Sequence, residues 1–279
     1  MDALVTTEWL AGELDAGDLR VVDATYLDAS LGRDPAAEYE RGHIPGAVFM
    51  NLGEQRDTGS DLPMMLPAPE KFASRMQSLG LGDGSRIVLY DDSPWRTAAR
   101  AWWMLRHFGA HDVALLDGGF AKWKAEGRPI ASGREQLRHR HFTIWADPMS
   151  VRTKEQVGAA LASGDEQLLD ARSAARFTGE EPDPRPGAAA GHMPGAMNLP
   201  YTQLFNADGT WKRGDALRQA FAASGVDLDR PIVTTCGSGI TASVLLFALH
   251  LLGRGGALYD GSWSEWGSDA GTPKATGAC

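Results

Sequence analysis

The stretch GHIPGA at residues 42–47 returns as GHMPGA at residues 191–196. Three more landmarks recur around this pair in the same order. They are VVDA at 21–24 and LLDA at 168–171, RIVLYDD at 86–92 and PIVTTCG at 231–237, and LLDGGFAKW at 115–123 and LYDGSWSEW at 258–266. Landmarks that repeat in order at an offset of about 145 residues indicate a duplicated unit. We therefore expect two copies of one domain.

Each copy has the sequence pattern of an α/β domain. Short apolar runs rich in β-branched residues have the length of buried parallel strands. These runs are residues 20–22, 87–89, 113–116, 232–234 and 257–259. Residues 97–108 and 241–252 are apolar almost all round, which predicts helices buried against a sheet. We expect each domain to be a parallel β-sheet flanked by helices.

The length and the middle of the chain predict where the domains divide. The 279 residues exceed what one ordinary hydrophobic core fills. A stretch rich in glycine, proline and charge lies between the copies. We therefore expect a first domain at residues 1–130, a linker at 131–149 and a second domain at 150–279.

The two GHxPGA stretches predict tight turns. Proline fixes φ in such a turn, and glycine supplies a positive φ. We interpret His43 and His192 as residues that stabilise these turns rather than as catalytic residues.

Composition excludes several classes of function. The formal net charge of −9 argues against a nucleic-acid or anionic-membrane partner. The N-terminal stretch carries Asp2, Glu8 and Glu13, which does not fit a signal peptide, and no stretch reaches the length of a membrane span. The seven histidines are scattered and form no metal-ligand cluster, so no metal is expected, and no organic cofactor is expected either. A cytoplasmic protein is the default expectation.

The two cysteines, Cys236 and Cys279, differ in their surroundings. Cys279 is the last residue, so a structural disulfide is not expected, and the sequence gives it no role. Cys236 stands between a predicted strand and a predicted helix, where the carboxyl ends of parallel strands form a ligand crevice. The residues after it are expected to form a cradle of inward-pointing amides that stabilises a thiolate or persulfide; they are Gly237, Ser238, Gly239, Ile240 and Thr241.

The loop CGSGIT, the paired GHxPGA turns and the closing YDGSWSEW resemble the tandem rhodanese-domain sulfurtransferases over nearly the entire chain. The resemblance implies that the second domain carries the persulfide on Cys236. It also implies that the first domain is a catalytically silent copy. Asp91 or Asp92 stands there in place of the cysteine, and a carboxylate cannot carry sulfane sulfur.

The same resemblance bears on the sulfur donor. The loop is similar to the CG-Ser/Thr-G-Val-T loop of the 3-mercaptopyruvate branch, with Ile240 in place of valine. Residues 172–187 resemble that branch's RF…EPRxG segment, which places its two substrate-binding arginines at Arg176 and Arg185. A planar guanidinium suits a carboxylate ligand. The alternative interpretation is that both arginines pair with Glu180, Glu181 and Asp183 on a surface loop.

The chain departs from the branch at one place. Residues 49–67 resemble the family segment that supplies an acid and a histidine for proton transfer. The acidic positions are Asn51 and Gly53 here, and the histidine is Met64. Ser238 is the remaining candidate for hydrogen bonding to the leaving enolate or to a water.

Three other functions compete with mercaptopyruvate sulfurtransfer. A thiosulfate sulfurtransferase typically has basic residues just after the cysteine, which this loop lacks. A rhodanese module used only for binding would not need Cys236 and its glycine loop. A phosphatase needs an arginine six residues after the cysteine, where Ala242 stands. The expected partners are a small sulfur donor and a thiol acceptor such as thioredoxin, a low-molecular-weight thiol or, in the test tube, cyanide.

Overall fold

The structure, a computed structural model, describes residues 1–136 and 138–278. Cys279 therefore lies outside the described residues. The chain forms two compact units. Unit 1 comprises Met1–Thr58, Leu66–Asp147 and Asn206–Trp211, and unit 2 comprises Gly59–Met65, Pro148–Phe205 and Lys212–Cys279. The sequence did not predict that two short segments, 59–65 and 206–211, group with the other copy.

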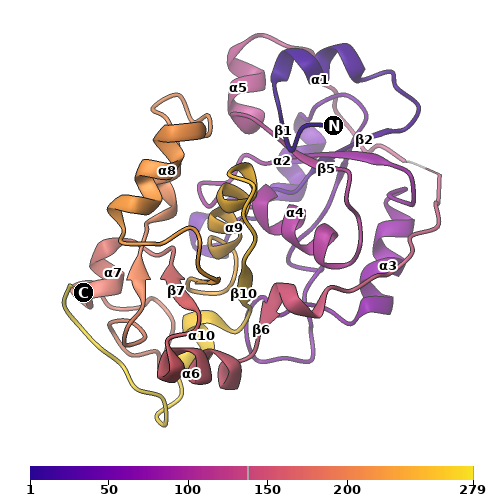
Figure 1. The fold of residues 1–279 in the computed structure, drawn as a ribbon. Coiled ribbons are helices and arrows are strands. Elements are labelled where there is room, and N and C mark those ends of the chain that lie inside the picture. Colours follow the sequence, from indigo (N-terminus) through magenta and orange to yellow (C-terminus); the bar gives the residue numbers. More distant parts are fainter. Residues whose placement is uncertain (137, 279) are drawn as a thin grey trace. The chain divides into compact units, whose positions relative to one another are not determined.

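Both units alternate strands and helices along the chain (Figure 1). Unit 1 contains β1 (Leu4–Val5), α1 (Thr7–Glu13), β2 (Leu19–Asp23), α2 (Pro35–Arg41), β3 (Ala47–Phe49), α3 (Pro69–Ser78), β4 (Arg86–Tyr90), α4 (Ala98–His107), β5 (Val113–Leu116) and α5 (Gly119–Ala125). Unit 2 contains β6 (Val151–Arg152), α6 (Lys154–Ser163), β7 (Gln167–Asp170), α7 (Ala174–Thr178), β8 (Met197–Asn198), α8 (Gly214–Ala223), β9 (Ile232–Thr235), α9 (Ala242–Leu251), β10 (Ala257–Tyr259) and α10 (Ser262–Trp266).

The two sheets have the same topology. The strand order is β1-β5-β4-β2-β3 in unit 1 and β6-β10-β9-β7-β8 in unit 2, and the strand pairs are parallel. Strands β5, β7, β9 and β10 are buried along their whole length, because helices cover both faces of a parallel sheet. The expected α/β class and the two parallel sheets are confirmed.

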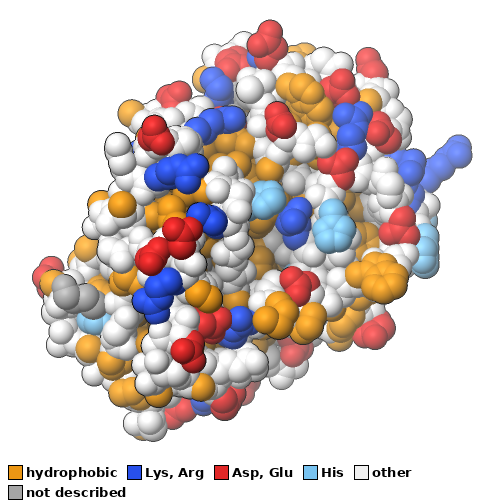
Figure 2. Space-filling view, in the orientation of Figure 1, with side chains coloured by type: hydrophobic (Ala, Val, Ile, Leu, Met, Phe, Trp, Pro, Cys, Tyr) orange, Lys and Arg blue, Asp and Glu red, His pale blue; other side chains and the backbone are white. Residues whose placement is uncertain are grey.

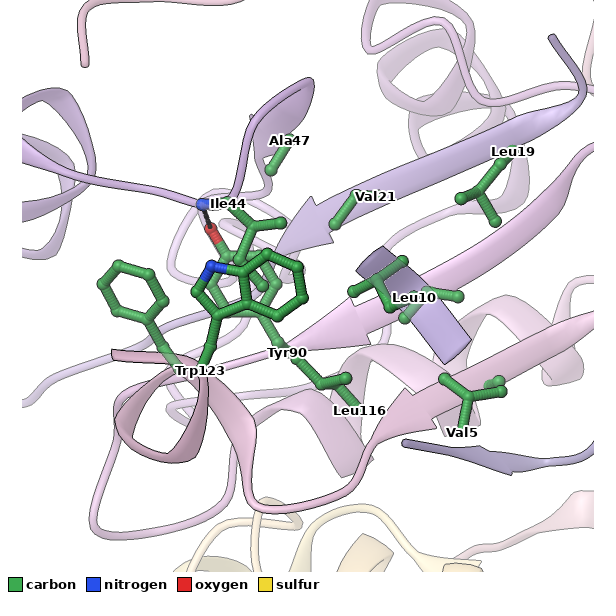
Figure 3. Packing of buried hydrophobic residues seen from close by; sticks show 12 residues of the cluster. Val5, Leu10, Leu19, Val21, Ile44, Ala47, Tyr90, Leu116 and Trp123 are labelled. Atoms are coloured by element: carbon green, nitrogen blue, oxygen red, sulfur yellow. Dashed lines mark hydrogen bonds between the residues drawn. The ribbon is translucent and has the colours of Figure 1, made fainter. Parts of the chain in front are cut away.

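One hydrophobic core of unit 1 lies between its sheet and the helices α1 and α5. Leu10 of α1 and Trp123 of α5 are fully buried there against Val21 and Val88 of the sheet. In Figure 3 the ring of Tyr90 lies beneath Trp123, and the Tyr90 hydroxyl accepts the Ile44 N–H at 3.3 Å. This bond ties the GHIPGA turn to the end of β4. In unit 2, the matching cluster contains Trp266, the counterpart of Trp123, so the repeat extends to the packing.

The two turns have the predicted backbone. Gly46 and Gly195 have φ of 75° and 82°, the left-handed region that glycine adopts at little cost. His43 and His192 are buried, and Nδ1 of each lies 2.8 Å from a backbone carbonyl oxygen. Each imidazole also stacks on an aromatic ring. These contacts support the structural interpretation of both histidines.

Charged side chains of both signs share the surface. On the face drawn in Figure 2, Asp and Glu side chains are interspersed with Lys and Arg. Among the described residues, the structure contains no helix that is long and apolar enough to cross a membrane.

Strand register identifies the counterpart of Cys236 in unit 1. Asp23 lies opposite Tyr90, and Asp170 lies opposite Thr235. Since VVDA and LLDA place Asp23 and Asp170 at equivalent positions, the next residues along β4 and β9 are equivalent too. The residue at the cysteine position of unit 1 is therefore Asp91, and not Asp92.

Asp91 and Asp23 are both buried carboxyl groups. Asp91 Oδ1 accepts the N–H of Ser93 at 3.0 Å, and its Oδ2 accepts the N–H of Ala98, the first residue of α4, at 2.7 Å. Asp23 Oδ1 accepts the Thr25 N–H at 2.9 Å. Burial raises the pKa of each carboxyl to about 6, above the ordinary 3.8, and the hydrogen bonds offset only part of this rise. Unit 1 therefore holds two carboxyl groups that ionise at a higher pH than an exposed aspartate does.

The raised pKa of Asp23 makes a pH-dependent prediction. Because the folded-state pKa lies above the unfolded value, ionisation destabilises the fold, and stability is regained as pH falls through 6 toward 3.8. The Asp23→Asn variant should therefore gain stability over the wild type at pH 7.5, and this advantage should shrink by about 1 kcal/mol at pH 5. Urea denaturation at the two pH values measures the difference. An advantage that does not change with pH, or one matched by the exposed control Asp2→Asn, would contradict the assignment.

Candidate active site

Cys236 lies directly after β9 and before α9, at the carboxyl edge of the second sheet. The residue is 2% exposed and its thiol is free. The Gly239 N–H donates to Cys236 Sγ at 3.2 Å. Gly239 has φ of 80°, and this left-handed turn directs its amide back toward the sulfur. At least one amide of the expected cradle therefore points at Cys236.

The start of α10 holds the backbone of this loop. The Trp263 N–H donates to the Cys236 carbonyl at 3.0 Å. The Gly237 carbonyl accepts two hydrogen bonds from Ser264, one from its N–H at 2.9 Å and one from Oγ at 2.6 Å. Each of these oxygens therefore has a donor from a segment that lies about 27 residues away in sequence.

Ser262 is a further contact to Cys236 that the sequence did not reveal. Its Oγ donates to the Tyr259 carbonyl at 2.8 Å and accepts the Cys236 N–H at 3.4 Å. Ser262 has φ of 51°, a conformation that costs a non-glycine residue energy. The equivalent residue of unit 1 is Gly119, with φ of 59°. Unit 2 thus carries a hydroxyl at a turn where unit 1 carries none.

The remaining loop residues have different environments. Ser238 is partly exposed, and Ile240 is buried. Thr241 precedes the first residue of α9. The Ser243 hydroxyl, which the sequence did not single out, donates to the Gly239 carbonyl at 3.1 Å. The loop is therefore bonded from α9 as well as from α10.

Arg176 and Arg185 share one carboxylate. Nη2 of Arg176, on α7, lies 2.5 Å from Asp183 Oδ2, and Nη1 of Arg185 lies 3.1 Å from Asp183 Oδ1. The Arg185 N–H also donates to Asp183 Oδ1 at 3.1 Å. Both arginines therefore pair with Asp183, as the alternative interpretation of the sequence predicts. Both arginine side chains keep part of their surface in solvent.

Arg185 also lies against the cysteine loop. A Cβ placed on Gly237 would lie 2.5 Å from Arg185 Nη2 and 2.7 Å from Nη1. Real Cβ atoms do not approach other atoms so closely, so the guanidinium occupies the space that a side chain at position 237 would need. The structure therefore brings one predicted arginine next to the residue that follows Cys236.

The Asp183 carboxylate stays ionised in this setting. Burial alone raises the pKa of Asp183, but the hydrogen bond from Arg176 and the charges of Arg176 and Arg185 outweigh it, so the pKa is lowered overall. The ion pairs therefore persist across the neutral pH range.

The positions of the missing acid and histidine have other roles. Asn51 Oδ1 accepts the Gly53 N–H at 3.1 Å in a turn of unit 1. Met64 is buried and belongs to the short segment that groups with unit 2. Among residues 1–136 and 138–278, no group of three or more His, Cys, Asp or Glu side chains could hold a metal ion.

The geometry supports nucleophilic chemistry on an anionic substrate. A thiol with an amide directed at its sulfur stands beside a guanidinium that is partly open to solvent. Such a thiol can attack a sulfur atom while the arginine holds a carboxylate of the same molecule.

Comparisons with known proteins agree on one family. The model of the rhodanese-like domain matches residues 6–126 and 153–269. A 3-mercaptopyruvate sulfurtransferase of Escherichia coli strain K12 is 42% identical over 273 residues, 96% of this chain and 96% of that protein. A thiosulfate sulfurtransferase of Cricetulus griseus is 39% identical over 272 residues, 95% of this chain and 91% of that protein. The crystal structure of SseA from Escherichia coli, from work on 3-mercaptopyruvate sulfotransferases, matches with a TM-score of 0.86 and 39% identity, covering 95% of this chain and all of that one.

The double hydrogen bond at Gly237 predicts the effect of Ser264→Ala. The variant keeps the N–H donor and loses the hydroxyl, so the cost should be about 1 kcal/mol rather than that of an unsatisfied carbonyl. The loosened loop should also let iodoacetamide reach Cys236 faster. Urea denaturation and alkylation kinetics measure the two effects. The matched control is Ser224→Ala, which removes the hydroxyl bond to the Phe221 carbonyl at the end of α8 and should leave alkylation unchanged. Equal alkylation rates in the two variants would contradict the role of Ser264.

Proposed function

This chain belongs to the rhodanese family, and we propose on that premise that it is a sulfurtransferase that takes sulfur from 3-mercaptopyruvate and carries it as a persulfide on Cys236. The observation that carries the proposal is the Arg185 guanidinium against Gly237, because it puts a carboxylate receptor beside the nucleophile. The relatives named 3-mercaptopyruvate sulfurtransferase support the choice of donor.

The first half-reaction moves one sulfur atom. Arg176 and Arg185 hold the carboxylate of 3-mercaptopyruvate while the Cys236 thiolate attacks its sulfur. A bond forms between the two sulfur atoms, the carbon–sulfur bond breaks, and its electron pair leaves with pyruvate as the enolate. Protonation of the enolate gives pyruvate. We assign Ser238 to this proton, through its hydroxyl or a water, because Gly53 and Met64 offer no titratable group.

The second half-reaction returns the enzyme to its starting state. The outer sulfur of the Cys236 persulfide is held by the amide cradle until a thiolate attacks it. The sulfur–sulfur bond to Cys236 breaks, the acceptor leaves as a persulfide, and the Cys236 thiolate is restored. The acceptor is a small thiol or a thioredoxin-type protein. A reducing compartment such as the cytoplasm suits this cycle, since Cys236 must return to a free thiol.

Unit 1 takes no part in sulfur transfer under this proposal. Asp91 occupies the cysteine position, and its carboxylate already accepts the loop amides of Ser93 and Ala98. The domain division at residues 1–130, 131–149 and 150–279 belongs to the same proposal, with the second domain as the catalytic one.

Thiosulfate is the second candidate donor. The relative from Cricetulus griseus is a thiosulfate sulfurtransferase at nearly the same identity. Thiosulfate lacks a carboxylate, however, and the residues that follow Cys236 in the loop carry no charge. The two donors therefore depend on Arg185 to different degrees.

The persulfide can be observed directly. Incubation of the full chain with 3-mercaptopyruvate should add about 32 Da, one sulfur atom, to the peptide that contains Cys236. Cys236→Ser should gain nothing and should release no pyruvate. Peptide mass spectrometry and a pyruvate assay measure both results. An adduct on Cys279 alone, or pyruvate release by the variant, would refute the proposal.

Arg185→Ala should separate the two donors. Loss of the carboxylate receptor should lower kcat/KM for 3-mercaptopyruvate by about 100-fold, as expected when a charge-assisted pair at a substrate is removed. The loss with thiosulfate should be smaller, because thiosulfate loses the attraction of the positive charge but no bond to a carboxylate. Gly237→Ala should give the same pattern by another route, because its methyl group displaces the Arg185 guanidinium. Steady-state kinetics with both donors measure this, and equal losses on both would show that Arg185 is structural.

A further inference from the structure

Five charged residues form one connected cluster beside the cysteine loop. Arg172, Arg176, Arg185, Asp170 and Asp183 are its members, and we call them the arginine cluster. Arg172 donates to Asp170 through Nε and Nη2 at 2.7 to 3.2 Å. Asp183 forms ion pairs with Arg176 and Arg185, and its Oδ2 lies 3.9 Å from Arg172 Nη1. Asp183 is therefore the carboxylate that joins all three arginines.

Burial divides the cluster into an inner and an outer part. The side chains of Arg172, Asp170 and Asp183 are 1 to 2% exposed. Those of Arg176 and Arg185 are 21% and 29% exposed. Water therefore reaches the two outer arginines while their shared carboxylate stays out of solvent. Charges in such a place are screened weakly, so each unit of charge affects a bound anion.

The cluster does not balance its charge. Arg172 and Asp170 form a pair with the Arg172 guanidinium 4.5 Å from the Trp263 ring centre. Arg176 and Arg185 then share the single negative charge of Asp183. Three positive and two negative groups leave one positive charge, and that charge faces the loop of Cys236 through Arg185.

We propose that Asp183 determines the donor preference of this site by holding the arginine cluster at one net positive charge, which matches a donor with one negative charge and disfavours a dianion. The inference rests on the proposed function, since it concerns donors of the same Cys236 site. 3-Mercaptopyruvate carries one carboxylate and neutralises the cluster. Thiosulfate carries two negative charges, and its excess charge would lie beside the attacking thiolate.

Asp183 also acts as a positioning residue. Its two oxygens fix the Arg176 and Arg185 side chains at 2.5 and 3.1 Å, and its Oδ1 binds the Arg185 backbone N–H. Loss of the carboxylate therefore has two separable effects. The cluster charge rises to two positive units, which favours a dianion, and the two guanidinium groups lose their common anchor, which harms recognition of a carboxylate.

The test is Asp183→Asn in the full chain, assayed with both donors. We expect kcat/KM for 3-mercaptopyruvate to fall and kcat/KM for thiosulfate to rise, so that their ratio changes by about tenfold or more, the scale of one unit of charge at a partly buried site. The gain with thiosulfate should shrink as salt is added. A merely structural role would lower both activities together, and that result would overturn the proposal.

Two variants serve as controls. Glu181→Gln removes a negative charge from an exposed residue two positions before Asp183. It should leave the donor ratio within about twofold, because exposed charges are strongly screened. Asp183→Glu keeps the charge and should keep the preference for 3-mercaptopyruvate over thiosulfate. A shift of the ratio in Glu181→Gln equal to that in Asp183→Asn would refute the specific role of Asp183.

A measurement on the wild type covers the case in which Asp183→Asn does not fold. Pyruvate, a monoanion, should inhibit competitively with a Ki at least about tenfold below that of the dianion sulfate. Equal inhibition by the two anions would overturn the charge argument. A wild type that forms no persulfide would instead sink the proposed function itself, so the two failures are distinguishable.

Discussion

The structure of the site depends on how the backbone of Cys236 and Gly237 is held. Their carbonyl oxygens point away from the cradle and accept hydrogen bonds from Trp263 and Ser264 at the start of α10. A loop that directs its N–H groups inward must direct its carbonyls outward, and buried carbonyls need donors. Helix α10 supplies them. The DGSWSEW stretch is therefore as much a part of the site as the CGSGIT loop.

Duplication gives an internal comparison for this arrangement. Unit 1 keeps the same frame, since the Phe120 N–H donates to the Asp91 carbonyl as the Trp263 N–H donates to that of Cys236. What differs is the side chain at the strand end. The Asp91 carboxylate accepts hydrogen bonds from backbone N–H groups of its own unit. Cys236 Sγ accepts a hydrogen bond from the Gly239 N–H and has the Arg185 guanidinium nearby. One scaffold thus holds a buried carboxyl group in one unit and a reactive sulfur in the other.

Much of the fold followed from the sequence because the repeat and the apolar runs are local signals. Residues 113–116 and 257–259 are the strands β5 and β10 as predicted. The two-residue strands β1, β6 and β8 escaped, since no periodicity can appear in two residues. The grouping of residues 59–65 with unit 2 also escaped, because it depends on packing between distant segments. Ser262 and Ser264 were missed for the same reason: their hydroxyls matter through contacts 26 and 27 residues away.

The two interpretations of Arg176 and Arg185 that the sequence left open prove to be compatible. Pairing with Asp183 does not prevent either arginine from binding a substrate anion, because a guanidinium has five N–H donors and Asp183 uses only some of them. The pairing sets the orientation of the groups that face solvent. Gly237 completes the arrangement, since a side chain there would occupy the space of Arg185. The small, uncharged cysteine loop and the Arg185 guanidinium therefore depend on each other, because a larger side chain at position 237 would displace the guanidinium.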